Sequence, residues 1–407
     1  MPVAVREGLW NTYPDQLYPK AFSVGSPALL PRDDVRIHPE RGLFSFTATP
    51  PETVVTTYHF GFMSSIGAGG FDTGVLTDLT APAPPVMVQG GGNGLNAALG
   101  AVAAAETVEI ADSLTYTGPA AALTLPNATF VLRSANQQRP VIRWGAGASP
   151  NWTIKGSGGA LVLQGLWLQG ADLVLDGDFD SVALRMVTLD PGSLDGNGAI
   201  VKSIDNLDLK PVHLVVRGRI KTLILERSIT GPIGTAGTGL IETLTATASI
   251  IQSIVPAEPA LATASGTASL SGCTVLGQTR VHRLNASECI LDDVASAEDA
   301  QDGCVRFSAY ARGSAIHAPY RSVAVPPRGP VFVSRRFGDP DYARLLRRAD
   351  AAILSPGPGD TIAAGARDGS EMGAFGPENI PRIKRGLAIK FEEYAPLGVY
   401  PVWIDAN

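Results

Sequence analysis

The sequence predicts a β-solenoid over about residues 107–323, in which short strands wind through successive turns that stack on one another. Short β-forming pieces recur about every 21 residues, with Gly, Asp, Asn or Pro between them and no long helical pattern. A repeat of this length made of β-formers is typical of solenoids, because stacked turns bury a column that one turn cannot bury alone. The pieces begin at Leu166, Val187, Ile229, Ile254, Val275 and Ile290.

We expect these six leading residues to stack in inward-facing ladders. The interval between Val187 and Ile229 is about twice the repeat, so it is interpreted as two turns. The 407 residues include 45 Gly and 31 Pro, which suits a turn-rich β architecture. The three cysteines, Cys273, Cys289 and Cys304, have no CxxC spacing and fall in successive turns. We therefore expect them to be small apolar core residues.

The charge pattern argues against nucleic acid as the main partner. The formal net charge is −6, and no block of Lys and Arg occurs. The first residues lack a basic segment followed by an apolar run, and no apolar run reaches the roughly 18 residues of a membrane span. We expect no signal peptide, no membrane span, and synthesis in the cytoplasm.

The N-terminal region, residues 1–85, is expected to form a small β-rich domain. Polar and apolar residues alternate in 34–38, 43–46 and 54–60, which is typical of antiparallel strands. The Gly-rich stretch 61–72 is interpreted as a structural loop, since no GK[ST] motif follows it.

The solenoid domain, residues 86–325, should open with a cap helix over residues 95–105. Leu95, Leu99 and Val102 are spaced for one helix face. A helix ahead of the first strand would cover the open edge of the first turn, where unpaired strand groups otherwise invite aggregation.

The C-terminal region, residues 326–407, is predicted to be a small α/β domain that covers the last turn. After a Pro-rich break, residues 331–337 have the composition of a strand and 342–348 that of a short helix. Residues 380–394 form a second helical pattern. Its apolar side carries Ile383, Leu387, Phe391 and Tyr394, while Ile389 falls on the far face.

Three aspartates, Asp176, Asp178 and Asp180, are the catalytic candidates of the chain. Alternation along an extended strand points all three carboxylates to one side, where they could act as an acid/base pair or hold Ca²⁺. The alternative is a turn at a corner, in which each Asp bonds nearby backbone. We favour the turn, and therefore expect no catalytic residues and no cofactor.

Other candidate groups have similar structural alternatives. Arg217, Arg219 and Lys221 could face an acidic sugar, but a salt-bridged surface is favoured. Trp144 and Trp152 could stack a sugar ring, but packing aromatics are favoured. The five histidines show no metal-binding spacing, so no metal site is predicted.

Residues 95–116 resemble the start of pectin-lyase-like β-helices. In that superfamily a cap helix leads into a strand and a D/G-x-x-x-Y turn, and here Asp112 and Tyr116 have that spacing. The resemblance covers about half the chain. It implies a right-handed parallel β-helix, a scaffold that carries lyases, hydrolases and non-catalytic spikes.

A second resemblance lies outside the repeats. The segments 337–343 (FGDPDYA), 365–375 (GARDGSEMGAF) and 387–399 occur in the same order in β-helical proteins encoded with the baseplate of phage tail-like contractile injection systems. Residues 58–72 (YHFGFMSSIGAGGFD) also resemble a segment of those proteins. After Phe375 this chain departs from their pattern, because GPEN replaces a polar lead-in.

This resemblance implies a structural component of such a particle that mediates assembly or surface attachment. The implied partners are other particle proteins, a cell-surface glycan and further copies of the chain, located in the cytoplasm or in a released particle. We expect an exposed loop to contact the partner, with a buried, self-bonded Asx/ST turn as the alternative. That loop is Asp368, Gly369, Ser370 and Glu371. The alternative function is a polysaccharide lyase or glycoside hydrolase.

Overall fold

The computed structural model describes most of residues 64–346 and shorter stretches on either side. The described residues are the strands at 35–38 and 43–46, then 64–73, 84–100, 107–145, 151–202, 208–339, 342–346, 349, 353, 366, 370–378, 386, 389–390 and 392–394. The chain divides into two compact units, residues 1–63 with 338–341 and residues 64–337 with 342–407. The three-domain division stays a prediction.

The first unit contains one antiparallel strand pair. Strands β1 (Val35–His38) and β2 (Leu43–Phe46) pair with Val35 opposite Phe46 and His38 opposite Leu43. This confirms antiparallel strands at 34–38 and 43–46. The strand predicted at 54–60 lies outside the described residues.

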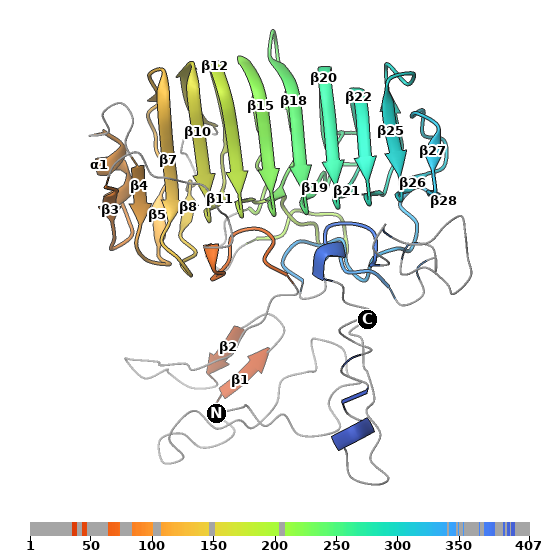
Figure 1. Ribbon diagram of the computed structural model, residues 1–407. Helices are drawn as coiled ribbons and strands as arrows, with labels where there is room; N and C mark the ends of the chain where they lie inside the picture. The colour runs from red at the N-terminus through yellow and green to blue at the C-terminus, as the bar shows by residue number, and fades with distance from the viewer. Residues whose placement is uncertain are drawn as a thin grey trace. The chain divides into compact units, whose positions relative to one another are not determined.

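The second unit is built from parallel sheets, which confirms the predicted all-β architecture (Figure 1). In the described part of the chain, one sheet has 16 strands and another has 10. The strands of the 10-stranded sheet are β5 (Thr115–Thr117), β8 (Val141–Arg143), β11 (Trp167–Gln169), β13 (Thr188–Leu189), β16 (Ile229–Thr230), β19 (Ile250–Gln252), β21 (Thr274–Leu276), β23 (Ile290–Leu291), β26 (Ala309–Ala311) and β28 (Val323–Val325).

The 16-stranded sheet holds the long strands. Its strands are β3 (Val86–Val88), β4 (Thr107–Ile110), β6 (Leu123–Thr124), β7 (Ala128–Ser134), β9 (Asn151–Ser157), β10 (Gly159–Gln164), β12 (Asp172–Arg185), β14 (Leu214–Val216), β15 (Arg219–Glu226), β17 (Ile233–Thr235), β18 (Leu240–Thr247), β20 (Leu261–Ser271), β22 (Thr279–Ser287), β24 (Ala295–Ala297), β25 (Gly303–Arg306) and β27 (Pro319–Tyr320).

Two of these long strands turn a corner, and this closes the pairing pattern on itself. The first part of β12 pairs with β14 and its second part with β15, and β20 likewise pairs with β17 and then with β18. The pairings therefore run through β12, β14, β17, β20, β18 and β15 and back to β12 as a closed ring of six strands. The corner of β12 lies at Gly177, whose φ of 81° suits glycine.

The core fills the space between the sheets, and its ladder differs from the predicted one. In the 10-stranded sheet the inward positions are the fully buried Ile142, Leu168, Leu189, Ile251, Val275 and Leu291. Leu166, Val187 and Val275 are core residues as predicted. Ile229 and Ile290 are buried, with 8% and 1% exposed, but they lie outside this inward cluster. Their neighbours along the strand face inward, so alternation turns them outward. The predicted inward position of Ile254 is also wrong, since this residue lies half-buried in the bend after β19.

A buried row of hydrogen bonds, which we call the polar spine, runs along one corner of the turns. Each member after the first, Val187, accepts a hydrogen bond from the backbone N–H of the member one turn earlier, as Ser228 does from Val187 and Cys289 from Cys273. The Ser and Cys members also donate to the carbonyl two residues before them. The spine consists of Val187, Ser228, Ser249, Cys273, Cys289, Ser308 and Ser322.

The spine corrects two predictions. Val187 and Ser228 are direct neighbours although 41 residues separate them, so the long interval is one turn with an insertion and not two turns. The insertion carries the antiparallel bridges Leu194–Ile200 and Lys202–Asp208. Cys273 and Cys289 are buried members of the spine, whereas Cys304 is exposed on β25 and is not a core residue.

Helix α1 (Gly94–Gly100) lies against the first turn. Leu95 and Leu99 are buried, and the helix contacts β3, β4 and β5. Since β3 ends the strand order of the large sheet, α1 covers that end, as predicted. Residues 101–105 of the predicted helix lie outside the described residues.

In the C-terminal region, Arg328, Arg335, Phe337, Tyr342 and the segment 370–378 pack along the flank of the turns, and this corrects their predicted place over the last turn. Arg328 pairs with Asp293 just after β23, and the Phe337 ring packs against Trp167 of β11 at 5.9 Å. The chain therefore runs back from β28 across earlier turns. The reason is the outward face of the 10-stranded sheet, which is largely apolar and needs cover. It carries the in-register residues Thr188, Ile229, Ile250, Thr274 and Ile290, which we call the outward ladder.

Local structure in this region differs in part from the prediction. Residues 342–346 are not helical, because Tyr342 bridges Ser334 and Leu345 bridges Phe332. A short 3-10 helix, η3 (Gly376–Glu378), was not predicted. In the pattern at 380–394, residues 386, 389–390 and 392–394 are helical, with Ile389 and Tyr394 55% and 77% exposed. The exposure of Tyr394 contradicts its predicted place on the apolar side. Ile383, Leu387 and Phe391 lie outside the described residues.

Candidate functional site

The three candidate aspartates lie on β12 but have different partners. Asp176 accepts a hydrogen bond from the N–H of Gly177 at 3.0 Å, which is the predicted turn. Asp180 accepts one from Lys221 at 2.6 Å, and this bond and the Lys221 charge lower the pKa of the Asp180 carboxyl. Asp178 is exposed and stands beside Arg219 of the next strand. The arrangement resembles a salt-bridged corner more than an acid/base pair.

A metal role for this cluster gains no support from the geometry. Within the residues that the structure describes, no three His, Cys, Asp or Glu side chains are grouped so that they could hold a metal ion. The expectation that the chain binds no cofactor stays a prediction, with Ca²⁺ as its alternative.

The basic row beside the aspartates is a salt-bridged surface, as favoured from the sequence. Arg219 Nε donates to Glu242 at 2.6 Å, and Lys221 pairs with Asp180. Arg217 lies exposed before the same strand. Exposed pairs of this kind contribute little to stability, about 0–1 kcal/mol each.

The two tryptophans proposed for sugar stacking are packing residues. Trp144 and Trp152 are 4% and 1% exposed, and their ring centroids lie 5.8 Å apart. Trp144 Nε1 also donates to the carbonyl of Pro119 at 3.0 Å. Neither indole face is open to a ligand.

An acid–base cluster that the sequence did not reveal surrounds His213. Its Nδ1 lies 2.8 Å from Asp172 Oδ1, and its Nε2 lies 3.1 Å from Glu258 Oε1. The hydrogen bond to Asp172 and the two negative charges raise the pKa of His213 against the lowering effect of burial. Since Asp172 and His213 are 41 residues apart, no local spacing could have signalled the cluster.

Buried polar groups fasten the C-terminal segment to the flank. Asp292, with 3% of its side chain exposed, is held by two guanidinium bonds from Arg335 at 3.0 and 2.7 Å. Burial raises the pKa of Asp292, while the Arg335 bonds oppose that rise. Gln252 donates to the Arg335 carbonyl at 2.7 Å and accepts from the Tyr342 hydroxyl at 2.6 Å.

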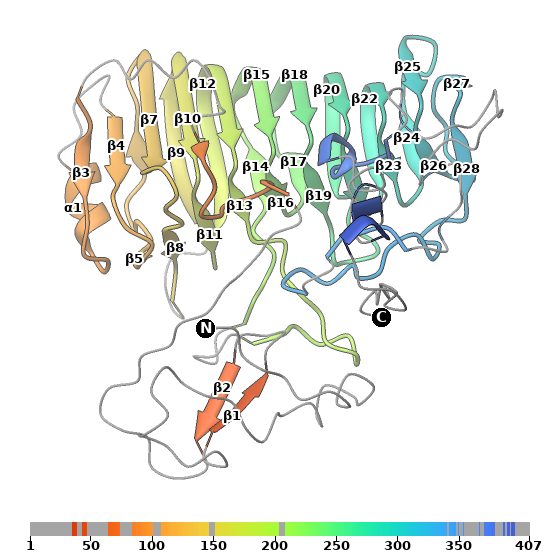
Figure 2. The same ribbon diagram turned by 60° about the horizontal axis from the view of Figure 1, so that its bottom comes forward.

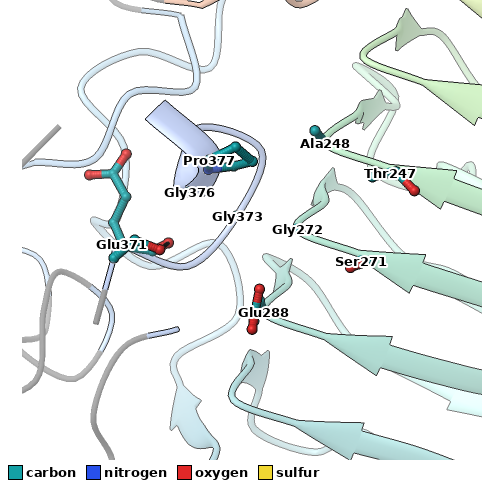
Figure 3. A pocket seen from close by; sticks show the side chains of 10 residues that line it. Thr247, Ala248, Ser271, Gly272, Glu288, Glu371, Gly373, Gly376 and Pro377 are labelled. Carbon is teal, nitrogen blue, oxygen red and sulfur yellow. Dashed lines mark hydrogen bonds between the residues drawn. The ribbon is translucent and has the colours of Figure 1, made fainter. Parts of the chain in front are cut away.

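The predicted partner-binding loop is internal where the structure describes it. Ser370 and Glu371 are 2% and 5% exposed, so the expectation of an exposed loop is wrong for these two residues. Asp368 and Gly369 lie outside the described residues. Ser370 and Glu371, together with Gly373, Gly376 and Pro377, line a pocket of about 200 Å³ against the turns that carry Ala248, Gly272 and Glu288. Figure 3 shows Pro377 directed toward Ala248 and Glu371 directed away from the strands.

A shallow polar groove of about 350 Å³ lies on the outer face of the long strands β18, β20, β22 and β25. Its floor contains two in-register rows. One row is Thr245, Ser269, Asn285 and Cys304, and the row beside it is Thr247, Ser271, Ser287 and Arg306, in which Thr247 lies at the edge of the groove. Neighbouring strands repeat these hydroxyl and amide groups about every 4.8 Å. The groove can therefore offer a flat array of hydrogen-bonding groups to an extended polar chain.

Comparison with known proteins leaves the family open. A scan against protein-family models found no match, and a search of curated proteins found no related protein. Among the described helices, none has the length and apolar character needed to cross a membrane. The functional assignment therefore depends on the geometry above and on the sequence resemblance.

Proposed function

We propose that the chain is a structural component of a phage tail-like contractile injection particle, associated with its baseplate or forming a spike-like projection. Its stacked turns would be a right-handed parallel β-helix of the pectin-lyase-like type, used as a rigid spacer. Its partners would be other particle proteins, and it would reside in the cytoplasm or in the released particle.

The observation that carries this proposal concerns the segments that resemble such particle proteins. The described parts of two of them, residues 64–72 and 370–375, pack on the flank of the turns through backbone hydrogen bonds. Gly67 donates to the carbonyl of Arg227, and Gly373 donates to the carbonyl of Glu288. The residues shared with those proteins therefore have a structural role, since they attach chain segments to a rigid scaffold. In a family of enzymes, the shared residues would instead surround a reaction centre.

The polar groove adds a specific role in surface attachment. Its hydroxyl and amide rows suit the hydroxyls of a glycan, and Arg306 at one side suits an acidic sugar. A polysaccharide lyase or hydrolase remains the second candidate function. Its support is this groove together with the exposed Asp178 on the same sheet.

Electron microscopy of particles purified from the source cells tests the structural role. We expect a tagged chain to be labelled at a fixed position on each particle, and deletion of its gene to remove that density or block assembly. Particles that form normally and never contain the chain would refute the proposal. Incubation with acidic and neutral polysaccharides, with and without Ca²⁺, should give no cleavage. Cleavage that is lost in Asp178→Asn would establish the enzyme instead.

A further inference from the structure

Two segments from opposite ends of the chain dock on the outward ladder in the same way. One is Ile66-Gly67-Ala68 and the other is Met372-Gly373-Ala374, which we call clip 1 and clip 2. Figure 2 shows clip 1 in orange beside β13 and β16 and the segment around η3 in blue beside β22 and β23. Both clips therefore lie on one flank of the stacked turns.

The contacts of clip 1 define a small receptor, which we call a cradle. The N–H of Gly67 donates to the carbonyl of Arg227 at 2.7 Å, and the N–H of Ala68 donates to the hydroxyl oxygen of Thr188 at 2.8 Å. Thr188 and Ile229 are paired neighbours on successive turns. Ile66, the apolar residue before the glycine, is 7% exposed.

Clip 2 repeats each of these contacts three turns further along the ladder. The N–H of Gly373 donates to the carbonyl of Glu288 at 2.8 Å, and the N–H of Ala374 donates to Thr274 Oγ1 at 3.0 Å. Thr274 is paired with Ile290, as Thr188 is with Ile229. The apolar residue before the glycine, Met372, is 1% exposed.

The glycine of each clip is selected by two independent constraints. Gly67 and Gly373 have φ of 77° and 95°, a conformation that L side chains rarely adopt. A Cβ on Gly67 would lie 2.6 Å from Thr188 Oγ1 and 2.9 Å from Ile229 Cδ1, and one on Gly373 would lie 2.7 Å from Thr274 Oγ1 and 2.8 Å from Ile290 Cδ1. The cradles therefore exclude every residue larger than glycine.

The turn carbonyl is also prepared in the same way at both cradles. Arg227 and Glu288 have φ of 47° and 60°, and each stands two residues before the Ile of its cradle. A residue in this conformation ends the preceding long strand and turns the chain toward the next sheet. Equal backbone conformation at both positions explains why both carbonyls meet a glycine N–H.

We propose that the outward ladder contains two equivalent peptide-binding cradles, each of which accepts an apolar-Gly-Ala segment in cis or in trans. Recognition uses two backbone N–H groups, a positive-φ glycine and one buried apolar side chain, so nothing in it requires the segment to belong to the same chain. The clips are 120 and 100 residues away in sequence from the threonines that bind them. The inference does not depend on membership of a particle.

The two cradles are also linked to each other. Ser64, just before clip 1, donates to Glu378 Oε1 at 2.7 Å, and Glu378 follows clip 2. The same carboxylate oxygen lies 3.7 Å from the guanidinium of Arg227, whose carbonyl holds Gly67. Loss of one clip should therefore loosen the other.

Residue-resolved hydrogen exchange on the full chain tests the equivalence of the cradles. Thr188→Val keeps the side-chain shape and removes the acceptor, so the Ala68 amide should exchange about 3- to 10-fold faster. Thr274→Val should do the same to the Ala374 amide. Thr245→Val, on the outer face of β18, is the matched control and should change neither. An unchanged amide in its own cradle variant would overturn the proposal.

Binding in trans is tested with the full chain carrying Gly373→Val, which empties the second cradle. A labelled peptide of residues 64–72 should bind this chain, and the same peptide with Gly67→Val should bind at least roughly tenfold more weakly. The unaltered chain, with both cradles filled, should bind neither peptide. Gly237→Ala is the matched control, because Gly237 has φ of 64° but open space around it. It should leave clip 2 docked and the peptide unbound.

Equal binding of the Gly and Val peptides would show that the cradle does not read the glycine and would refute the assignment. Absence of any peptide binding to the Gly373→Val chain, with its circular dichroism unchanged, would limit the clips to a role in cis and refute the trans claim. Where Gly373→Val itself prevents folding, the exchange experiment with Thr188→Val and Thr274→Val still decides whether the two cradles are equivalent.

Discussion

The backbone N–H of Val187 donates a hydrogen bond to the Ser228 hydroxyl oxygen at 3.2 Å, although 41 residues separate the two in sequence. Ser228 also donates to the carbonyls of Leu184 and Glu226, both at 3.0 Å. One hydroxyl therefore satisfies buried groups of two successive turns at the point where the chain makes its longest excursion. The polar spine thus keeps the turns in register while their length falls from 41 residues here to 14 between Ser308 and Ser322.

Ser228→Ala should lower the free energy of unfolding by about 1–3 kcal/mol, because it leaves the buried N–H of Val187 without its acceptor. Urea denaturation followed by circular dichroism measures this change. Ser271→Ala is the matched control, since Ser271 is exposed at the end of β20, and it should change the stability by less than about 0.5 kcal/mol. Equal effects at the two positions would show that the spine contributes nothing.

A second prediction tests the direction in which the ladder residues face. Ile251 is fully buried among core residues, whereas Ile254 is half-buried in a bend three residues later. Ile251→Asp should bury an unpaired carboxylate and cost more than about 4 kcal/mol. Ile254→Asp should cost far less, since its carboxylate can reach water. Comparable melting temperatures for the two variants would contradict the register described above.

These examples show what the sequence could and could not predict. The repeat of β-forming pieces predicted parallel stacked turns, because hydrophobic periodicity reports directly on burial. It could not separate Ile229, which faces outward, from Ile251, which faces inward. Both faces of the 10-stranded sheet are covered, so both carry apolar residues and the alternation that would set the register is lost.

The candidate sites depended on contacts that local patterns do not contain. The corner at Asp176 and the salt bridge of Lys221 followed from residue types, and both were anticipated. The His213 cluster and the clips join residues 41 to 120 positions apart, and only folding brings them together. The Gly-rich stretch was interpreted as a structural loop, and its described part, residues 64–72, packs on the outward ladder. Two residues of that ladder, Ile229 and Ile290, had themselves been predicted to face inward.

The His213 cluster predicts a pH dependence of stability. The pKa of His213 is raised above its usual value of about 6.5 by Asp172 and Glu258, so folding favours the protonated ring. The stability it contributes is fully present below the unfolded pKa and is lost as pH rises through the higher folded pKa.

The free energy of unfolding, measured by urea denaturation from about pH 5.5 to 9, should therefore show a decrease above about pH 6.5 that His213→Gln removes. His317→Gln is the control, because His317 is half-buried like His213, and the hydrogen-bond partner of its Nδ1 is the Ala318 carbonyl at 3.3 Å rather than a carboxylate. A pH profile of His213→Gln that matches the unaltered chain would mean that the cluster is not linked to folding.

The last prediction concerns the attachment of the C-terminal segment through Arg335 and Asp292. Arg335→Met removes both guanidinium bonds and leaves the Asp292 carboxylate, 3% exposed, without its main counter-charge. Breaking one partner of a buried pair costs about 3–5 kcal/mol, because the remaining charge stays desolvated. The Arg335→Met substitution should weaken the attachment of the segment more than it weakens the stacked turns, since Arg335 lies outside those turns.

Tryptophan fluorescence can report detachment of the segment, because Trp167 contacts Phe337 of the same segment. Arg335→Met should change this fluorescence at a lower urea concentration than the loss of β-sheet circular dichroism. Adding Asp292→Asn to the same chain removes the stranded charge and should bring the two transitions back toward coincidence. If Arg335→Met leaves the transitions coincident and unshifted, the pair does not hold the segment on the flank.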